Sequence, residues 1–273
     1  MDKTEFLYKT RPGRLLLGIL ISRPVSVLAG IILDSRASKV LIDPFVRKNN
    51  INLWDYQTDN INSFNDFFCR RIKDGLRPIA TEKNALISPC DAFLSAYKID
   101  KGTVLSIKQS SFTIASLLRD KGLAKRFDGG YALVYRLCVN HYHRYVYFDS
   151  GKKYKNRKIR GVYHTVRPTA LCERPVFIEN SREYAVMGTD NFGLCVQMEV
   201  GAMMVGRIVN EHKEECRVER GAEKGHFEFG GSTVIVLLQK NRAHLREDIA
   251  QNLNNNVEIP VIMGEKIGQA AHR

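Results

Sequence analysis

The sequence predicts an α+β fold in which a mostly antiparallel β core follows a helical N-terminal segment. Three observations lead to this prediction. The chain has 273 residues, 44% of them hydrophobic, which is enough to bury a substantial core. Its first fifty residues carry two apolar runs. After Pro78, short and often alternating apolar runs are separated by Gly, Pro, Asn and Asp, as in an antiparallel sheet. We therefore divide the chain into a helical segment, residues 1–60, and a main domain, residues 61–273.

The two apolar runs, 15–21 and 25–33, predict two short helices. Each is shorter than the ~20 apolar residues that a membrane-spanning helix needs, and Arg23-Pro24 interrupts their union. Basic residues flank the runs. Such amphipathic helices can lie in the interface of an anionic membrane, and we expect these to be membrane-associating. The alternative is two ordinary helices packed on the core. The flanking basic residues are Lys9, Arg11, Arg14, Arg36 and Lys39.

In the main domain, the pattern predicts few helices and many strands. Ser63 is the expected N-cap of a helix that continues toward Arg71, and 111–118 is the second expected helix. The remaining runs predict strands. These are 86–88, 92–99, 103–107, 131–148, 162–166, 176–178, 184–187, 194–200 and 234–238.

Charge and cysteine usage restrict the partners. The formal net charge of +13 predicts attraction to a polyanion, either nucleic acid or an anionic lipid surface. We favour the lipid surface over nucleic acid, because the basic residues accompany apolar helices and no nucleic-acid-reading motif is recognisable. The six cysteines show no CxxC pair or Cys/His pair at ligand spacing, so we expect no metal site and a reduced, cytosol-facing protein. The N-terminus also lacks the pattern of a cleavable signal peptide.

One short segment, FGGST at residues 229–233, offers reactive chemistry. One interpretation is a glycine turn or bulge that joins two strands. The other is that the glycines let the backbone bring the Ser232 hydroxyl onto the carbonyl of Gly231. Attack on that carbonyl gives an ester, and elimination then splits the chain between 231 and 232. Hydrolysis of the resulting dehydroalanine leaves a pyruvoyl group.

Five segments in order along the chain resemble the phosphatidylserine decarboxylase family. The resemblance runs from the apolar N-terminal segment almost to the end of the chain. It implies conversion of phosphatidylserine to phosphatidylethanolamine and carbon dioxide, through a Schiff base with a pyruvoyl group derived from Ser232. The segments are 64–70 (FNDFFCR), 88–91 (SPCD), 142–145 (YHRY), 200–208 (VGAMMVGRI) and 229–234 (FGGSTV), the last with Gly221, Glu223 and Gly225 upstream.

The resemblance also implies that an Asp–His–Ser arrangement drives the self-cleavage, with Asp91 and Ser232 as two members. A serine hydroxyl needs a histidine to accept its proton and a carboxylate to orient that histidine. His143 is the first candidate for the histidine and for the acid that reprotonates the product. Many relatives carry a second histidine three residues later, where this chain has Val146. His164 is the alternative source of the missing imidazole.

His141 is a weaker candidate, which shares a face with His143 if the strand stays regular. Gly201 and Gly206 are expected to allow close backbone approach around the site.

Two other functions remain open from the sequence. Val146, together with Ala92 where relatives have glycine, motivates a non-catalytic lipid-binding relative that has lost processing. A serine hydrolase that uses Ser232 directly is the other. The expected partners are phosphatidylserine, an anionic membrane surface and the two processed chains, and the family suggests a homodimer. The expected location is peripheral, on the cytoplasmic face of the cell membrane.

Overall fold

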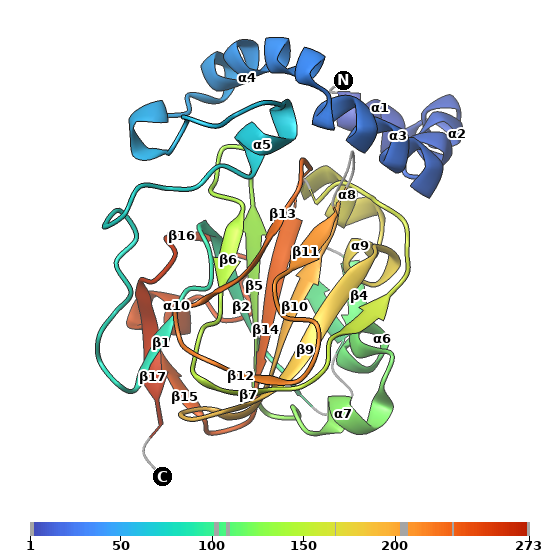
Figure 1. The fold of residues 1–273 in the computed structure, drawn as a ribbon. Helices are drawn as coiled ribbons and strands as arrows, with labels where there is room; N and C mark the ends of the chain where they lie inside the picture. Colours follow the sequence, from blue (N-terminus) through green and yellow to red (C-terminus); the bar gives the residue numbers. More distant parts are fainter. Residues whose placement is uncertain are drawn as a thin grey trace.

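The computed structural model describes residues 3–100, 104–107, 110–166, 168–202, 207–230 and 232–271. The fold is α+β, as the sequence predicts. Every pair of named strands in the described residues is antiparallel. Figure 1 shows the strands as one body, with the N-terminal helices extended across one end of it.

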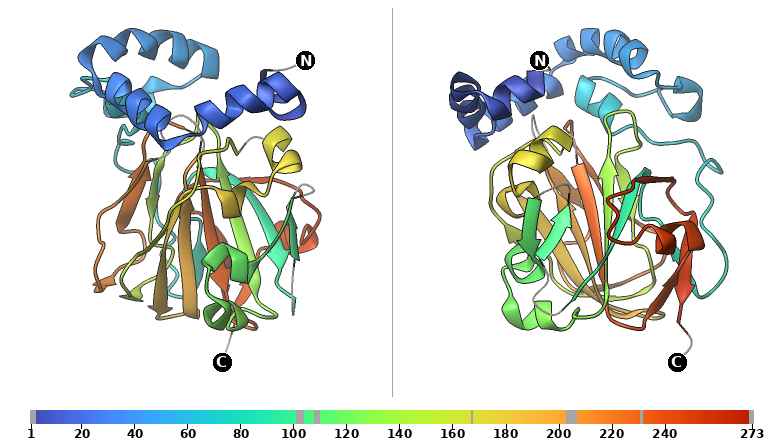
Figure 2. Two further views of the ribbon diagram at one scale, coloured as in Figure 1. Left: turned by 90° about the vertical axis from the view of Figure 1, so that its right-hand side faces the viewer. Right: turned by 180° about the vertical axis from the view of Figure 1, so that it is seen from behind.

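Helices make up most of the described N-terminal segment. Both predicted helices form, as α2 and α3, and the Thr10 hydroxyl caps α2 by accepting from the Gly13 amide at 3.0 Å. The views in Figure 2 show these helices at the same end of the sheets from both directions. The elements are α1 (Lys3–Lys9), α2 (Arg11–Leu20), α3 (Arg23–Asp34), the 3-10 helix η1 (Arg36–Leu41), α4 (Ile42–Asn49), the 3-10 helix η2 (Leu53–Asp55) and α5 (Phe64–Phe68).

In the described part of the chain, no single helix is long and apolar enough to cross a membrane. The segments Arg11–Leu20 and Pro24–Asp34 reach that length and composition only together, and they are bent by 61° where they meet.

The largest sheet has nine strands in the described residues. Its strand order is β12-β7-β9-β10-β14-β5-β2-β16, and β8 pairs with β9 beside that path. The strands are β2 (Ala92–Lys98), β5 (Tyr131–Leu137), β7 (Gly151–Lys153), β8 (Arg157–Ile159), β9 (Arg182–Thr189), β10 (Gly193–Val200), β12 (Cys216–Val218), β14 (Ser232–Leu238) and β16 (Ile259–Val261).

Three smaller sheets and five short helices complete the described fold. The sheets are β1-β17-β15, β11-β13-β6 and β3-β4. Their strands are β1 (Ala85–Ile87), β3 (Val104–Ile107), β4 (Ser110–Thr113), β6 (Arg144–Val146), β11 (Ile208–Asn210), β13 (Glu223–Phe227), β15 (Ala243–Leu245) and β17 (Lys266–Ala270). The helices are α6 (Ile114–Leu118), α7 (Lys121–Lys125), α8 (Pro168–Glu173), α9 (Val176–Glu179) and α10 (Glu247–Gln251).

The large sheet separates two hydrophobic clusters, one on each face. Side chains alternate along a strand, so β14 sends Val234 and Val236 into one cluster and Ile235 and Leu237 into the other. All seven residues of β14 are buried. By the same alternation, Ser232 lies on the face of the sheet that carries Val234. The hydrophobic cluster on this face also contains residues of α5 and β6.

The structure corrects several element predictions. Residues 176–178 are helical, in α9, and 162–166 form no strand beyond a single bridge at Val162. The expected strand 131–148 is two strands, β5 and β6, separated by a turn. Only the second half of 111–118 is helical, because Thr113 forms a capping box that starts α6 at Ile114. The helix predicted after Ser63 forms, with the Ser63 hydroxyl accepting from the Asp66 amide, but it ends at Phe68 and does not continue toward Arg71.

Candidate active site

The sequence motifs meet at the end of the large sheet that faces the N-terminal helices (Figure 1). Ser232 begins β14 and lies opposite Leu137, the last residue of β5. On the other side of β14, Val200 at the end of β10 lies opposite Thr233. Asp91 immediately precedes β2, the other neighbour of β5. Antiparallel pairing therefore brings segments that are far apart in the sequence to the same end of the large sheet.

The FGGST segment is not a hairpin turn. β13, before it, pairs with β11 and β6, whereas β14, after it, pairs with β10 and β5. The segment is thus a crossing from a small sheet to the large one. Gly230 has φ +143°, a backbone conformation that residues with a side chain rarely adopt. Gly231 and Gly206 lie outside the described residues.

The 64–70 motif holds this crossing in place. The Asn65 side-chain oxygen accepts from the Phe229 amide at 3.2 Å, and the Cys69 thiol donates to the Phe227 carbonyl at 3.5 Å. The Phe229 ring packs edge-on against Phe64 and Phe68, with centroids 4.9 and 5.1 Å away. Aromatic contacts of this geometry add to the burial of the rings. Two motifs that are over 150 residues apart thus form one rigid unit.

Ser232 is fully buried, at 0% exposure. Its hydroxyl has no hydrogen-bond partner among the described residues. A buried hydroxyl without a partner costs about 1–3 kcal/mol, so such groups are uncommon in folded proteins.

His143 is also buried, with 1% of its surface exposed. Its Nδ1 lies 2.9 Å from the His141 carbonyl, which can only accept, so Nδ1 carries the proton and Nε2 carries the lone pair. Nε2 has no partner in the described structure. The ring lies against Phe68 at 4.1 Å, and Phe68 also contacts Phe229, so His143 and the crossing share a neighbour. Burial lowers the pKa of His143 to about 3, which keeps the imidazole neutral near pH 7.

Asp91 lies at the same end of the large sheet, but its hydrogen-bond partners are neither Ser232 nor His143. Its carboxylate accepts from Arg77 through Nε at 2.8 Å and through Nη2, and from the Met263 amide at 2.8 Å. Burial lowers the pKa of His141, and the charge of Asp91 acts against that effect. No hydrogen bond joins Asp91 to His143 in the described residues. Asp91 is thus paired with Arg77, and of these two histidines it is His141 whose pKa the charge of Asp91 affects.

The expectation that His141 and His143 share a strand face is wrong. The His141 amide donates to the Cys138 carbonyl at 2.9 Å, which closes a turn after β5 and ends the alternation. The Cys138 amide in turn donates to Nδ1 of His141 at 3.2 Å. The His141 ring packs on Phe93, 5.1 Å away, whereas His143 packs on Phe68.

His164 lies in an irregular segment, and both of its ring nitrogens have partners. Nδ1 lies 3.0 Å from the Tyr8 hydroxyl, and Nε2 lies 3.0 Å from the Glu179 carboxylate. Asn180 then connects the His164 backbone to the Gly201 carbonyl. His164 therefore ties α1 to α9.

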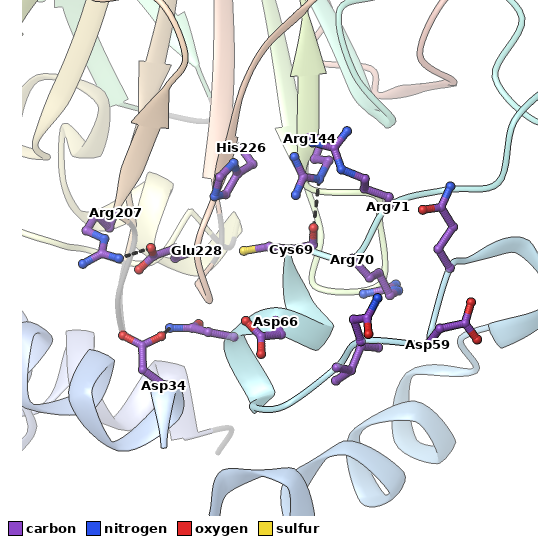
Figure 3. Close-up of a pocket in the computed structure, with 14 residues that line it drawn as sticks. Asp34, Asp59, Asp66, Cys69, Arg70, Arg71, Arg144, Arg207, His226 and Glu228 are labelled. Atoms are coloured by element: carbon purple, nitrogen blue, oxygen red, sulfur yellow. Dashed lines mark hydrogen bonds and ion pairs between the residues drawn. The ribbon is translucent and has the colours of Figure 1, made fainter. Parts of the chain in front are cut away.

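A cavity of about 630 Å³ lies next to the crossing (Figure 3). Residues from α5, β6 and β13 line it, together with the ends of α3 and of the crossing. The sequence predictions include none of its charged residues as site residues, although four of them, Asp66, Arg70, Arg144 and Arg207, stand within the quoted motifs. The arginines are Arg70, Arg71, Arg144 and Arg207, and the acids are Asp34, Asp59, Asp66 and Glu228.

One group of side chains has the spacing of metal ligands. Glu211, Glu223 and His226 each offer one ligand atom, and these atoms lie within 4.8 Å of one another. Glu223 is already paired with Arg71 and Arg144. Its charge is therefore largely neutralised without an ion.

The chain matches the family described as phosphatidylserine decarboxylase over residues 64–269. It is 40% identical to phosphatidylserine decarboxylase proenzyme 2 of Clostridium acetobutylicum, over 97% of this chain and 91% of that protein. It is also 40% identical to the phosphatidylserine decarboxylase proenzyme of Ruminiclostridium cellulolyticum, over 96% and 89%. Identity to the corresponding proenzyme of Clostridium botulinum is 39%, over 97% and 91%.

Proposed function

Because the chain belongs to the phosphatidylserine decarboxylase family of carboxy-lyases, we propose that it decarboxylates phosphatidylserine with a pyruvoyl group made from Ser232. The observation that carries the mechanism is the buried hydroxyl of Ser232, which has no partner in the described structure. It stands at the end of a crossing between two sheets that the 64–70 motif holds firmly. The name proenzyme, which the relatives carry, agrees with a chain that must be processed.

In the proposed processing, the Ser232 oxygen attacks the carbonyl carbon of Gly231. The bond from that carbon to the Ser232 nitrogen breaks as the ester forms. Removal of the Ser232 α-proton then expels the Gly231 carboxylate and leaves dehydroalanine. Water converts this residue to the pyruvoyl group and releases ammonia. No outside oxidant or reductant is needed, because the α-carbon of Ser232 is oxidised to a carbonyl while its β-carbon is reduced to a methyl group.

We propose His143 as the base that accepts the Ser232 proton. Its Nε2 lone pair is buried and unpartnered in the described residues, and its Nδ1 proton is fixed on the His141 carbonyl. His164 is a poorer candidate, because Tyr8 and Glu179 already occupy its two nitrogens. For Asp91 we propose a positioning role, in which its contacts to Arg77 and Met263 hold the start of β2 beside the end of β5.

The pyruvoyl group, when formed, supplies a carbonyl that takes up the electrons released as carbon dioxide leaves. The residues around Ser232 would serve that chemistry in two ways. Phe68 and Phe229 exclude water from the start of β14. The imidazole of His143, once protonated, is our candidate to return a proton to the substrate carbon.

We also propose that the chain works at the cytoplasmic face of the cell membrane. Apolar residues at i and i+4 positions of α2 and α3 are exposed, which gives each helix an uncovered apolar face. These helices stand over the end of the sheet that carries Ser232 (Figure 1). The exposed residues include Leu15, Ile19, Val27, Leu28, Ile31 and Ile32.

Mass spectrometry of the denatured protein tests the processing. The wild-type chain should give two pieces of 231 and 42 residues, the smaller with a blocked N-terminus. Ser232→Ala should give one intact chain that releases no carbon dioxide from phosphatidylserine. Ser35→Ala, at an exposed serine, should cleave as the wild type does. An intact wild-type chain with full activity would exclude the pyruvoyl mechanism.

The same experiment separates the alternatives. A lipid-binding relative without processing would bind vesicles, stay in one piece and release no carbon dioxide. A serine hydrolase would stay in one piece and react with a fluorophosphonate at Ser232.

A further inference from the structure

Arg70 is a buried cation without an anion. It follows α5, and only 4% of its surface is exposed. Its guanidinium lies over the rings of Tyr56 and Phe67, 4.0 and 4.5 Å from their centroids. Nη1 donates to the Phe67 carbonyl at 3.1 Å. Nε and Nη2, which form one edge of the planar fork, have no hydrogen-bond partner among the described residues.

Each of the other arginines of the cavity has an acidic partner. Arg144 and Arg71 pair with Glu223, and Arg207 pairs with Glu228. Burying an unpaired cation costs several kcal/mol, so buried charges are normally paired. In the part of the chain that the structure describes, no acid forms an ion pair with Arg70, although the same cavity has acidic residues in its wall.

We propose that Arg70 binds a phosphate oxyanion through Nε and Nη2. This rests on the proposed function, in which the oxyanion is the phosphodiester of the phosphatidylserine head group. Free inorganic phosphate has the same chemistry and is the other source. Adjacent N–H groups of a guanidinium match two oxygens of a phosphate in a bidentate contact, and stacking on the two rings holds the fork in its plane.

The position of Arg70 suits a head group. Figure 3 shows its side chain among the cavity-lining residues, on the side of Asp59. The volume, about 630 Å³, lies within the range of small-ligand sites. Arg70 is two residues from Phe68, which contacts both His143 and Phe229. The charge of Arg70 also contributes, after burial, to the lowered pKa of His143. A phosphate on Arg70 would thus lie close to the reacting end of the substrate.

Calorimetric titration of the full-length Ser232→Ala chain tests the site without any processing or decarboxylation. The probes are inorganic phosphate, glycerophosphoserine and free serine, which lacks phosphate. We expect both phosphates to bind and serine to bind at least tenfold more weakly. Arg70→Gln should weaken both phosphates at least tenfold, and Arg70→Lys should retain part of the affinity because it keeps the charge but loses the fork. Arg217→Gln, at an exposed arginine paired with Asp190, should bind as the parent does.

Each outcome has a definite meaning. Tighter binding of glycerophosphoserine than of phosphate supports the head group as the source, and equal binding supports an oxyanion site that free phosphate also fills. Phosphate affinity unchanged in Arg70→Gln overturns the proposal, as does serine binding equal to that of glycerophosphoserine. If Arg70→Gln fails to fold, Arg70→Lys carries the test, and unchanged phosphate affinity in this variant overturns it too. If phosphate binds through Arg70 but the wild-type chain, with Ser232 in place, is never cleaved, the proposed function alone is refuted.

Discussion

Several buried polar atoms lack a hydrogen-bond partner in the described structure, and some of them belong to the residues of the proposed site. They include the Ser232 hydroxyl, that of the adjacent Thr233, Nε2 of His143 and two nitrogens of Arg70. Each costs roughly 1–3 kcal/mol if nothing binds it, more for the charged Arg70. A fold that keeps several such atoms has been selected for something other than stability. Reaction and substrate binding are the functions that we assign to them.

His143 makes stability depend on pH. Its pKa is near 6.5 in an unfolded chain and about 3 in the folded one, so between these values the unfolded chain binds the extra proton. Stability from this group is therefore present above pH 6.5 and is lost as the pH falls toward 3. From pH 7 to pH 5, His143 alone should lower the free energy of unfolding by about 2 kcal/mol. Urea unfolding of wild type and His143→Gln at both pH values measures this, and the variant should lose that share of the dependence.

His244→Gln is the matched control, because this histidine is exposed on β15. It should keep the full pH dependence of the wild type. A His143→Gln variant with an unaltered pH dependence would show that the imidazole is not buried in its neutral form.

The sequence names Ser232 and His143 as candidate site residues, but it does not show how the histidines are arranged. The motifs and the chemistry of a serine next to glycine are local, so they are readable from the chain. Whether His141 and His143 share a face depends on one hydrogen bond, from the His141 amide to Cys138, that turns the chain. The unpaired guanidinium of Arg70 could not be predicted either, since its lack of a partner is recognisable only when its neighbours in the fold are known.

At the scale of elements, the apolar runs predicted the five central strands of the large sheet, β9, β10, β14, β5 and β2. They missed its short strands β7, β8, β12 and β16 and failed for two short apolar runs. Residues 176–178 have β-branched and aromatic side chains, yet they form α9. Pro175 and hydrogen bonds from Ile178 and Glu179 back to it override the local preference. The FGGST segment also looked like a hairpin, because sequence alone does not show that β13 and β14 belong to different sheets.

A buried ion pair connects these two sheets. Lys224 of β13 lies 2.7 Å from Glu199 of β10, both side chains have 0% exposure, and Asn210 of β11 contacts both. Lys224→Met leaves Glu199 buried without its cation, and should lower the free energy of unfolding by about 3–5 kcal/mol. Adding Glu199→Gln removes the unpaired charge and should recover part of that loss. Urea unfolding of the single and double variants measures both effects.

The exposed pair Lys155–Glu214 is the control for this cycle. Lys155→Met should change the free energy of unfolding by less than about 1 kcal/mol. If Lys224→Met is equally mild, the buried pair does not stabilise the contact between the sheets.

The apolar faces of α2 and α3 predict vesicle binding. Replacing Leu15, Ile19, Val27 and Ile31 by serine should weaken binding to phosphatidylserine-containing vesicles at least tenfold, because each exposed aliphatic side chain gains about 1 kcal/mol or more on leaving water. Sedimentation with vesicles measures the partition. A serine at exposed Ile262, after β16, should have no effect. Equal binding by the fourfold variant would mean that another surface contacts the lipid.

At the scale of the whole molecule, the proposed cleavage site lies beside a central strand. β14 is fully buried between β10 and β5, six register pairs join it to β10, and seven join it to β5. Such a strand is ordered only when its neighbours are in place. The Gly230 conformation, the Asn65 contact and His143, the proposed base, also come from elements that meet only in the folded chain. Folding should therefore precede cleavage.

This order of events predicts that the two pieces remain one particle after cleavage. The 42-residue piece contains β14 to β17, and losing it would open the large sheet between β10 and β5. Size-exclusion chromatography of the processed protein should elute both pieces together in native buffer and separate them only in denaturant.

The cleavage itself should be first order, with a rate that does not change over a hundredfold range of protein concentration, since every group it uses lies in one chain. Ile235→Asn, which places an amide in the core beside β14, should slow cleavage in proportion to the unfolded fraction, whereas Val257→Asn, at an exposed position, should not. Release of the small piece in native buffer would contradict this account of β14, and a rate that rises with concentration would mean that one chain cleaves another.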